Sequence, residues 1–304
     1  MTTPSRAIVI RRTGPPDVLV LEDATLRPLA LGEVRLRSLA SAINHSDLEI
    51  RAGNWAIRRE PRFPYVPGLE VVGEVVEVAP DVTEFAIGDR AWTTMQGLGG
   101  VRAERDGGYA DHVAVDARVL APLPRDVDPV AFASIGLAGV TALESIRRVG
   151  PVAGKTLVVS GASGGVGAVG VEIGRAMGAN VIGLVRNSPM PAAGTADAVI
   201  DGVAGPLFAT LVASLRAGGR YCIYGAVAGG DVAFDAWSLL DGRALTGYSS
   251  EDLDGDALRA ATRELLALRM PAAPGTTVMP LAAAARAHAM LEARSVKGRV
   301  VLVA

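Results

Sequence analysis

Residues 157–167 read Leu157-Val158-Val159-Ser160-Gly161-Ala162-Ser163-Gly164-Gly165-Val166-Gly167, an apolar run followed by a cluster of glycines. The apolar run predicts a buried strand, and the residues after it predict a helix over 166–177. In this setting Gly161 permits a tight turn, Gly164 removes a side chain that would block a phosphate, and Gly167 lets the helix pack closely on the strand. The pattern favours a dinucleotide-binding turn over a glycine-rich turn without a ligand.

The start of the predicted helix offers further contacts for a phosphate group. Backbone N–H groups in the first turn of a helix lack partners within the helix, and the helix dipole places partial positive charge there. The residues that we expect at this position are Ser163, Gly164, Gly165 and Val166. They join Gly161 and Gly167 as predicted cofactor-binding residues.

The end of the next predicted strand bears on the kind of dinucleotide. NAD-binding folds usually place Asp or Glu there, where the carboxylate holds the 2′-hydroxyl of the ribose. This chain instead has the segment Leu184-Val185-Arg186-Asn187-Ser188. The Arg186 guanidinium can bind a 2′-phosphate, and Asn187 and Ser188 can donate further hydrogen bonds. The sequence therefore favours NADP(H), with a solvated surface arginine as the alternative.

The pattern of the chain changes near Pro124. Before it, short β-branched runs are separated by Pro, Gly and Asp, which predicts a β-rich domain of the barrel or sandwich type. After it, strands alternate with helices, which predicts an α/β domain with a parallel sheet. Gly225 follows the strand predicted over 220–224, at the end where such sheets bind ligands, although a plain turn explains it nearly as well.

The composition excludes several other functions. The chain has 304 residues, enough for two domains, and 30 Lys and Arg residues against 32 Asp and Glu residues. A net charge of −2 gives no electrostatic reason to bind nucleic acid or an anionic membrane. The single cysteine, Cys222, closes no intramolecular disulfide. We see no apolar run of membrane-spanning length and no signal peptide, so we expect a cytoplasmic protein.

Further segments can be compared with known families. They are Gly14-Pro15-Pro16-Asp17-Val18-Leu19, Ile43-Asn44-His45-Ser46-Asp47-Leu48, Pro67-Gly68-Leu69-Glu70-Val71-Val72-Gly73, Gly107-Gly108-Tyr109-Ala110-Asp111-His112-Val113, Gly139-Val140-Thr141-Ala142 and Lys297-Gly298-Arg299-Val300-Val301-Leu302. In this order, and together with the glycine turn, they resemble the medium-chain dehydrogenase/reductase superfamily. Within it, the chain is most similar to the zinc-free quinone oxidoreductases and enone reductases. The resemblance covers nearly the whole chain.

The resemblance implies a GroES-like catalytic domain formed by residues 1–123 and 272–304, with a Rossmann NADP(H)-binding domain, residues 124–271, between them. It implies hydride transfer from the nicotinamide to a quinone or to the conjugated C=C bond of an α,β-unsaturated carbonyl. Relatives commonly join their Rossmann sheets edge to edge, which here implies a homodimer through residues 244–249.

Two residues in the matching motifs, Thr141 and Lys297, are implied to bind the cofactor. An equally good alternative is that Lys297 and Arg299 are simply two solvated surface charges.

The resemblance also bears on zinc. Zinc-dependent relatives carry a cysteine where this chain has Asn44 and a histidine where it has Leu69, and their four-cysteine loop has no counterpart here. A tetrahedral zinc site needs at least three protein ligands, and Glu70 alone cannot supply them. We therefore expect no catalytic zinc.

Without zinc, hydrogen-bond donors must polarise the acceptor. This is sufficient for a quinone or an enone, because hydride addition gives a delocalised anion. Asn44 can donate through its amide, and Ser46 aligns with the hydroxyl that relays protons in zinc-dependent relatives. Asp47 could orient this loop or the nicotinamide ribose. Turn capping is the alternative for Asn44 and Asp47, and a structural role is the alternative for Ser46.

Trp55 stands where many zinc-free relatives have a tyrosine that can act as an acid. Its indole N–H donates a hydrogen bond but does not transfer a proton. We expect it to form a flat wall against a conjugated substrate, with a packed surface tryptophan as the alternative. The proton donor stays open among Tyr65, Tyr109, His45 and solvent.

The Rossmann part of the chain is about one βα unit shorter than the resemblance implies. Residues 187–195 contain Pro189, Pro191 and Gly194, which make a poor helix. Residues 197–203 look like two family strands merged into one. We therefore predict that the outer third strand is missing, that about five strands remain, and that the adenine side of the cofactor pocket is open.

Three hypotheses for the function follow. The leading one is an NADPH-dependent, zinc-free reductase of quinones or conjugated enones. The second is a biosynthetic relative that reduces or cyclises a specialised intermediate, because Trp55 replaces the tyrosine. The third is an NADP(H)-binding sensor or structural protein without turnover, because the Rossmann domain is short.

Overall fold

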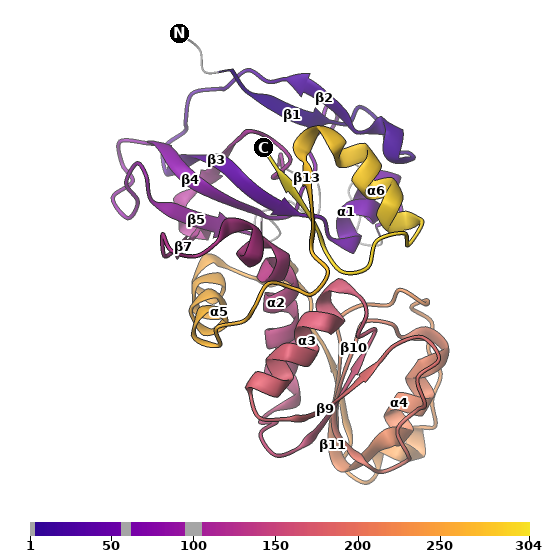
Figure 1. Ribbon diagram of the computed structural model, residues 1–304. Helices are drawn as coiled ribbons and strands as arrows, with labels where there is room; N and C mark the ends of the chain where they lie inside the picture. The colour runs from indigo at the N-terminus through magenta and orange to yellow at the C-terminus, as the bar shows by residue number, and fades with distance from the viewer. Residues whose placement is uncertain (1–3, 56–61, 95–104) are drawn as a thin grey trace. The chain divides into compact units, whose positions relative to one another are not determined.

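A computed structural model describes residues 4–55, 62–94 and 105–304. The chain forms two compact units (Figure 1). The first unit contains Met1–Leu137, Ser250–Arg263 and Pro271–Ala304, and the second contains Ala138–Ser249 and Glu264–Met270. The N-terminal and C-terminal segments therefore belong to the same unit.

The first unit is rich in β-strands. These are β1 (Arg6–Val9), β2 (Val20–Asp23), β3 (Glu33–Ala42), β4 (Val71–Val78), β5 (Arg90–Thr93), β6 (His112–Asp116), β7 (Ala121–Leu123), β13 (Thr277–Pro280) and β14 (Val300–Val303). β1 and β2 pair with each other, and the larger sheet has the order β13-β14-β3-β4-β5-β7, with β6 paired to β3. The long strand β3 organises this sheet, because it pairs antiparallel with β4, β6 and β14.

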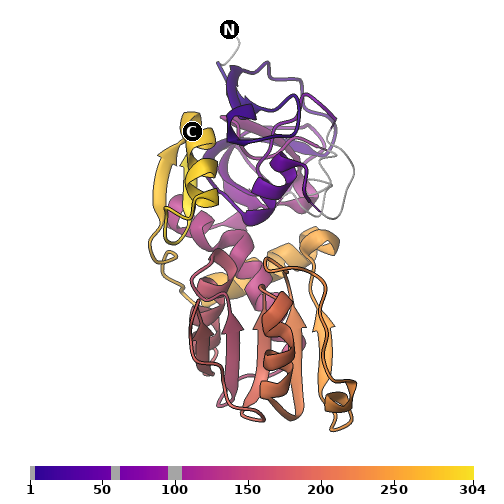
Figure 2. The ribbon, with the colours of Figure 1, turned by 90° about the vertical axis from the view of Figure 1, so that its right-hand side faces the viewer.

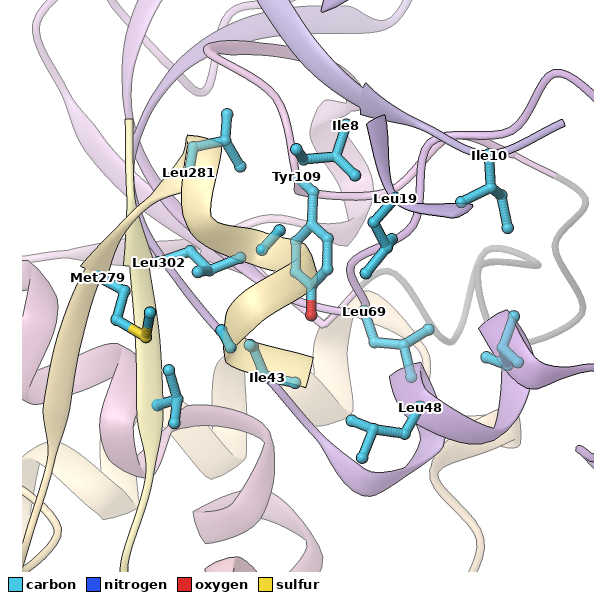
Figure 3. Close-up of a cluster of buried hydrophobic side chains, with 14 of the residues drawn as sticks. Ile8, Ile10, Leu19, Ile43, Leu48, Leu69, Tyr109, Met279, Leu281 and Leu302 are labelled. Carbon is cyan, nitrogen blue, oxygen red and sulfur yellow. The ribbon is translucent and has the colours of Figure 1, made fainter. Parts of the chain in front are cut away.

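Two short helices of the first unit, α1 (His45–Ala52) and α6 (Ala284–Glu292), share one hydrophobic cluster. Side chains from β1, from the C-terminal strands and from the segment around Tyr109 complete this cluster (Figure 3). On α6, Ala284 and Ala287 are fully buried, and such small side chains let a helix approach its neighbours closely. The cluster therefore fixes α1, which carries the predicted catalytic residues Ser46 and Asp47, against the C-terminal segment.

Two longer helices, α2 (Pro129–Val149) and α5 (Gly255–Ala267), each begin in the first unit and end in the second. Residues 124–137 and 250–263 group with the first unit. Hydrogen bonds hold both segments to it. The Leu137 N–H donates to the carboxylate of Glu70 (2.9 Å), and Trp92 Nε1 donates to the hydroxyl of Thr262 (2.9 Å).

By length and composition, α2 could cross a membrane. However, 78% of its most apolar window is buried inside the protein, so the helix is weak evidence for a membrane span.

The second unit is a parallel α/β structure. Its elements are β8 (Thr156–Ser160), α3 (Gly165–Ala176), β9 (Asn180–Leu184), β10 (Ala196–Asp201), α4 (Phe208–Ser214), β11 (Leu215–Ile223) and β12 (Ala244–Gly247). The strands form one sheet in the order β12-β11-β10-β8-β9, and every pair is parallel (Figure 2). The structure thus confirms the predicted fold class, an α/β protein with a β-rich part and a doubly wound parallel sheet.

The sheet of the second unit lacks one strand of the usual arrangement. A doubly wound sheet has the order 3-2-1-4-5-6. With β8 as strand 1, β9 takes the place of strand 2 and is the edge, and within the described residues no strand 3 follows it. A non-helical link over 185–195 runs to β10 instead, held by hydrogen bonds from Gly194 N–H to Ala213 (3.1 Å) and from Thr195 N–H to Ser214 (2.9 Å). The predicted five-stranded sheet is therefore confirmed.

Candidate functional site

The predicted glycine turn joins β8 to α3 in the second unit. Gly161 has a φ of +62°, a conformation that side chains other than glycine rarely adopt. A Cβ atom on Gly167 would lie 2.2 Å from the carbonyl oxygen of Gly161, which no side chain could tolerate. Gly164 is the N-cap of α3, and it is exposed together with Ser163. The turn therefore presents an open helix N-terminus at the carboxyl end of the sheet, where an anion can bind.

A second turn follows β9. Val185 N–H donates to the hydroxyl oxygen of Ser188 (3.0 Å), and Ser188 N–H donates to the carbonyl of Val185 (3.0 Å). Asn187 has a φ of +66°, which suits the third position of such a turn. Arg186 is exposed and has no ion pair within the part of the chain that the structure describes. Its guanidinium is thus available to a phosphate.

The loops after β10 and β11 lie beside the glycine turn. A Cβ atom on Gly161 would be 3.2 Å from the side chain of Val203, and one on Gly225 would be 3.1 Å from the carbonyl oxygen of Gly202. The carboxyl ends of three neighbouring strands therefore meet, and the structure brings Gly225 together with the glycine turn. Thr141, on α2, is partly buried in the same unit.

Asp201 ties these loops together and was not among the predicted site residues. Its carboxylate is fully buried and accepts hydrogen bonds from the hydroxyls of Ser160 and Tyr221. It also accepts the backbone N–H groups of Val203 (2.8 Å) and Ala204 (3.0 Å). The sequence signal that could have identified Asp201 is an acidic residue at the last position of a buried strand.

The first unit holds a separate buried polar cluster around Asn44. Asn44 Nδ2 donates to Glu70 Oε1 (2.9 Å) and to the carbonyl of Ala42 (3.3 Å), and Asn44 Oδ1 accepts from Arg299 Nη2 (3.0 Å). Arg299 Nη2 also lies 3.2 Å from Glu70 Oε1. Both N–H bonds of the Asn44 amide are therefore engaged within the protein. Sequence reasoning proposed no role for Glu70 and favoured Lys297 over Arg299; Lys297 is exposed and Arg299 is buried.

The helix α2 approaches this cluster closely enough to bond to it. The second carboxylate oxygen of Glu70 accepts the Leu137 N–H, and a Cβ atom on Gly136 would lie 2.4 Å from that oxygen. Burial raises the pKa of Glu70, and the positive charge of Arg299 opposes this effect. Because residue 136 is glycine, the Glu70 carboxylate can accept the backbone N–H of Leu137 as well as the hydrogen bond from Arg299.

Asp47 connects two segments of the first unit. Its Oδ2 accepts the Asn44 N–H (2.8 Å), which caps the start of α1, and its Oδ1 accepts the Leu69 N–H (3.0 Å). The side chain is 1% exposed, and burial raises the pKa of Asp47 to about 7, with the backbone hydrogen bonds opposing. Asp47 therefore both caps the helix, as the structural alternative predicted, and fixes the segment that carries Glu70.

Two further predicted residues have different surroundings. The Ser46 hydroxyl has no hydrogen-bond partner in the described part of the chain, and the residue is 9% exposed. Trp55 is partly buried and packs against the hydrophobic cluster of the first unit, which matches the structural alternative for this residue. We expect the loops over 54–63 and 94–105 to line the substrate pocket, and their stretches 56–61 and 95–104 lie outside the described residues.

The residues at this position do not fit a zinc ion. Leu69 is 1% exposed and belongs to the hydrophobic cluster. Asn44 and Glu70 are hydrogen-bonded to each other and to Arg299, whose positive charge would repel a cation. A tetrahedral zinc site needs three or more anionic or imidazole ligands, and this donor set supplies one carboxylate.

Two family models match the sequence. The first, "Alcohol dehydrogenase GroES-like domain", matches residues 30–125, and the second, "Zinc-binding dehydrogenase", matches residues 177–302.

Several curated proteins are similar to this chain. A quinone oxidoreductase of Lama guanicoe is 34% identical over 180 residues, which cover 59% of this chain and 52% of that protein. A 2-haloacrylate reductase of Burkholderia sp. is 35% identical over 184 residues, and the human quinone oxidoreductase is 31% identical over 180 residues, with the same coverage. The match thus spans about half the length of these curated relatives.

Solved structures match over nearly the whole chain. AibC superposes with a TM-score of 0.85 at 26% identity, covering 100% of this chain and 96% of that one. Mycobacterial Rv1454c complexed with NADPH superposes with a TM-score of 0.82 at 29% identity, covering 99% and 100%. A structure described as a mycobacterial quinone oxidoreductase gives a TM-score of 0.84 at 28% identity, with the same coverage.

Proposed function

This chain belongs to the medium-chain dehydrogenase/reductase superfamily, and we propose that it is a zinc-independent, NADPH-dependent reductase of a quinone or a conjugated enone. The turn between β8 and α3 carries this proposal. Gly167 lies close against the carbonyl of Gly161, and the tight turn leaves the N-terminus of α3 open at the carboxyl end of a parallel sheet. The similar quinone oxidoreductases and the NADPH-bound neighbour support it.

The second unit would hold the dinucleotide. The N–H groups of Gly165 and Val166 at the start of α3 would bind the pyrophosphate. Arg186 and the Ser188 hydroxyl would bind the 2′-phosphate, since the Ser188 oxygen already accepts from Val185 and its proton is left for a ligand. Residues 185–188 contain no Asp or Glu, so no carboxylate in this turn would select the free ribose 2′-hydroxyl of NAD(H).

The first unit would hold the acceptor. The bound nicotinamide would supply the hydride. The Ser46 hydroxyl is the donor left for the acceptor's carbonyl oxygen, because the Asn44 amide is engaged with Glu70 and Ala42. The Arg299 guanidinium, buried beside Asn44, would add positive electrostatic potential where negative charge develops on the acceptor.

The first test is a fluorescence titration with NADPH and NADH. We expect tighter binding of NADPH, and we expect Arg186→Ala to weaken NADPH binding about 10- to 100-fold while NADH binding stays the same. Arg175→Ala, which removes an exposed arginine paired with Glu172 on α3, is the matched control and should change neither affinity. Equal binding of both cofactors by the unaltered protein would contradict the 2′-phosphate assignment.

A second candidate function is NADP(H) binding without turnover. The missing third strand favours it, because the cofactor's adenosine half then has fewer contacts. A panel of simple quinones and conjugated enones separates the two functions. Oxidation of NADPH by a member of the panel supports the reductase, whereas binding without oxidation across the panel supports the sensor.

A further inference from the structure

The sheet of the second unit reverses its strand order between β8 and β10. From β8 the chain continues to β9 on one side, and the next strand, β10, lies on the other side of β8. In a doubly wound sheet, a dinucleotide binds at the carboxyl ends of the strands at such a reversal, with one half on each side. Ser160 is the last residue of β8 and Asp201 is the last residue of β10, and their side chains are hydrogen-bonded to each other. This contact therefore joins the two strands at the place where a dinucleotide would cross.

Three further hydrogen bonds connect these two side chains to the loop that follows β10. The Ser160 hydroxyl donates to Asp201 Oδ1 and also accepts the N–H of Gly202 (3.1 Å). Asp201 Oδ1 accepts the N–H of Val203 (2.8 Å), and Asp201 Oδ2 accepts the N–H of Ala204 (3.0 Å). Ser160 and Asp201 are both 0% exposed. Two buried side chains thus hold three consecutive backbone N–H groups.

The loop after β10 has an uncommon backbone conformation. Ala204 has a φ of +53°, which residues other than glycine rarely adopt. Such a conformation persists where surrounding contacts fix it, and it is frequent beside bound ligands. The same loop contacts the glycine turn, because a Cβ atom on Gly161 would lie 3.2 Å from the side chain of Val203. Ser160 and Asp201 therefore fix the loop over 202–204 against the glycine turn.

A third side chain reaches the same carboxylate but does not join β8 to β10. The Tyr221 hydroxyl, on β11, donates to Asp201 Oδ2. Burial raises the pKa of Tyr221, so the phenol keeps its proton. Its ring packs on Phe208 of α4, with centroids 4.9 Å apart. Tyr221 is therefore a matched comparison for Ser160, since each gives one hydroxyl to Asp201.

We propose that Ser160 and Asp201 are positioning residues for the nicotinamide half of the cofactor, because they hold the loop over 202–204 against the glycine turn. The adenosine half is assigned to the 185–188 turn after β9, on the other side of β8. The two halves of one dinucleotide then depend on different residues. This inference rests on the proposed function, since it requires a dinucleotide at this end of the sheet.

Calorimetric titrations with NADPH and with 2′,5′-ADP test the proposal, because 2′,5′-ADP carries the 2′-phosphate but no nicotinamide. For Ser160→Ala we expect the Kd of NADPH to rise about tenfold while the Kd of 2′,5′-ADP stays within about twofold. Asp201→Asn, which turns an amide NH₂ toward backbone N–H donors, should separate the two ligands further. Arg186→Ala should instead weaken both ligands.

Tyr221→Phe is the control for Ser160→Ala, because it removes a hydroxyl from the same carboxylate and keeps the ring. It should leave both Kd values within about twofold. Equal weakening of NADPH by Ser160→Ala and Tyr221→Phe would overturn the assignment. Equal weakening of NADPH and 2′,5′-ADP by Ser160→Ala would overturn it too, because a general disturbance of the second unit affects both ligands.

Amide hydrogen exchange, followed by NMR without cofactor, tests how the loop is held. We expect Ser160→Ala to speed exchange of the Gly202 N–H at least about tenfold and Tyr221→Phe to leave it unchanged. Unchanged exchange in Ser160→Ala would overturn the role of this hydroxyl. If the protein binds NADPH but reduces no acceptor, the proposed function fails and the titrations still decide this inference. If the unaltered protein binds neither ligand, both fail.

Discussion

Glu70 and Arg299 lie 3.2 Å apart, although 229 positions separate them in the sequence. The sequence motif identified Asn44, Ser46 and Asp47 because they are neighbours in the chain. It could not show that β14 delivers Arg299 to the same place, because only the pairing of β14 with β3 does so. Lys297, two positions before Arg299, is exposed, so of these two cations only Arg299 is buried beside Glu70.

His288 makes a measurable contribution to the pH dependence of stability. The unfolded chain takes up a proton on this imidazole below its ordinary pKa of 6.5, whereas the folded chain does so only near 3. Protons therefore favour the unfolded state, and stability is lost as the pH falls from 6.5 toward 3.

We expect the unaltered protein to lose about 2 kcal/mol more than His288→Gln between about pH 7.5 and about pH 5. Urea unfolding of both proteins at the two pH values measures this difference. Asp47 has a raised pKa and acts in the opposite direction, but it is present in both proteins. Equal losses would mean that His288 is protonated inside the folded protein.

At the scale of elements, the order of strands and helices followed from hydrophobic pattern and glycine or proline punctuation. The helix α2 is continuous over Pro129–Val149 although it contains Gly139, a residue type that lowers helix propensity. A Cβ atom there would lie 3.1 Å from Leu265 of α5, so this glycine serves the packing of two helices and does not end one.

Adding a single methyl group at Gly167 tests the role of the turn between β8 and α3. Gly167→Ala places a Cβ atom against the carbonyl of Gly161, a backbone group that cannot rotate away. We expect at least about tenfold weaker NADPH binding and a loss of about 1–3 kcal/mol in the free energy of unfolding.

Titration and urea unfolding measure the two effects. Gly230→Ala is the control, because a Cβ atom there has no neighbour within 4 Å. Unchanged NADPH affinity in Gly167→Ala would show that the turn does not carry the cofactor.

At the scale of the whole molecule, the sheet of the second unit has two free edges, β12 and β9. The expected homodimer uses the first. In the segment before β12, Trp237 is 77% exposed and Leu240 is 74% exposed, and exposed apolar side chains that lie close together mark interaction sites.

We expect sedimentation to show a dimer that Trp237→Lys combined with Leu240→Lys converts to a monomer. Ile87→Lys changes a residue of similar exposure, 71%, in the first unit and should leave the dimer intact. A monomeric unaltered protein, or a dimer that survives both lysines, would contradict association through this edge.

The other edge has a consequence for handling the protein. β9, over Asn180–Leu184, contains no charge and no proline, and Ile182 is 38% exposed. Sheet proteins normally place charged residues or proline on their outer strands, because an unprotected strand edge can pair with further chains and form aggregates. In the six-stranded arrangement this strand is interior and has no need of that protection. The loss of one βα unit therefore leaves at the edge a strand without such protection, and we expect Ile182→Lys to reduce aggregation.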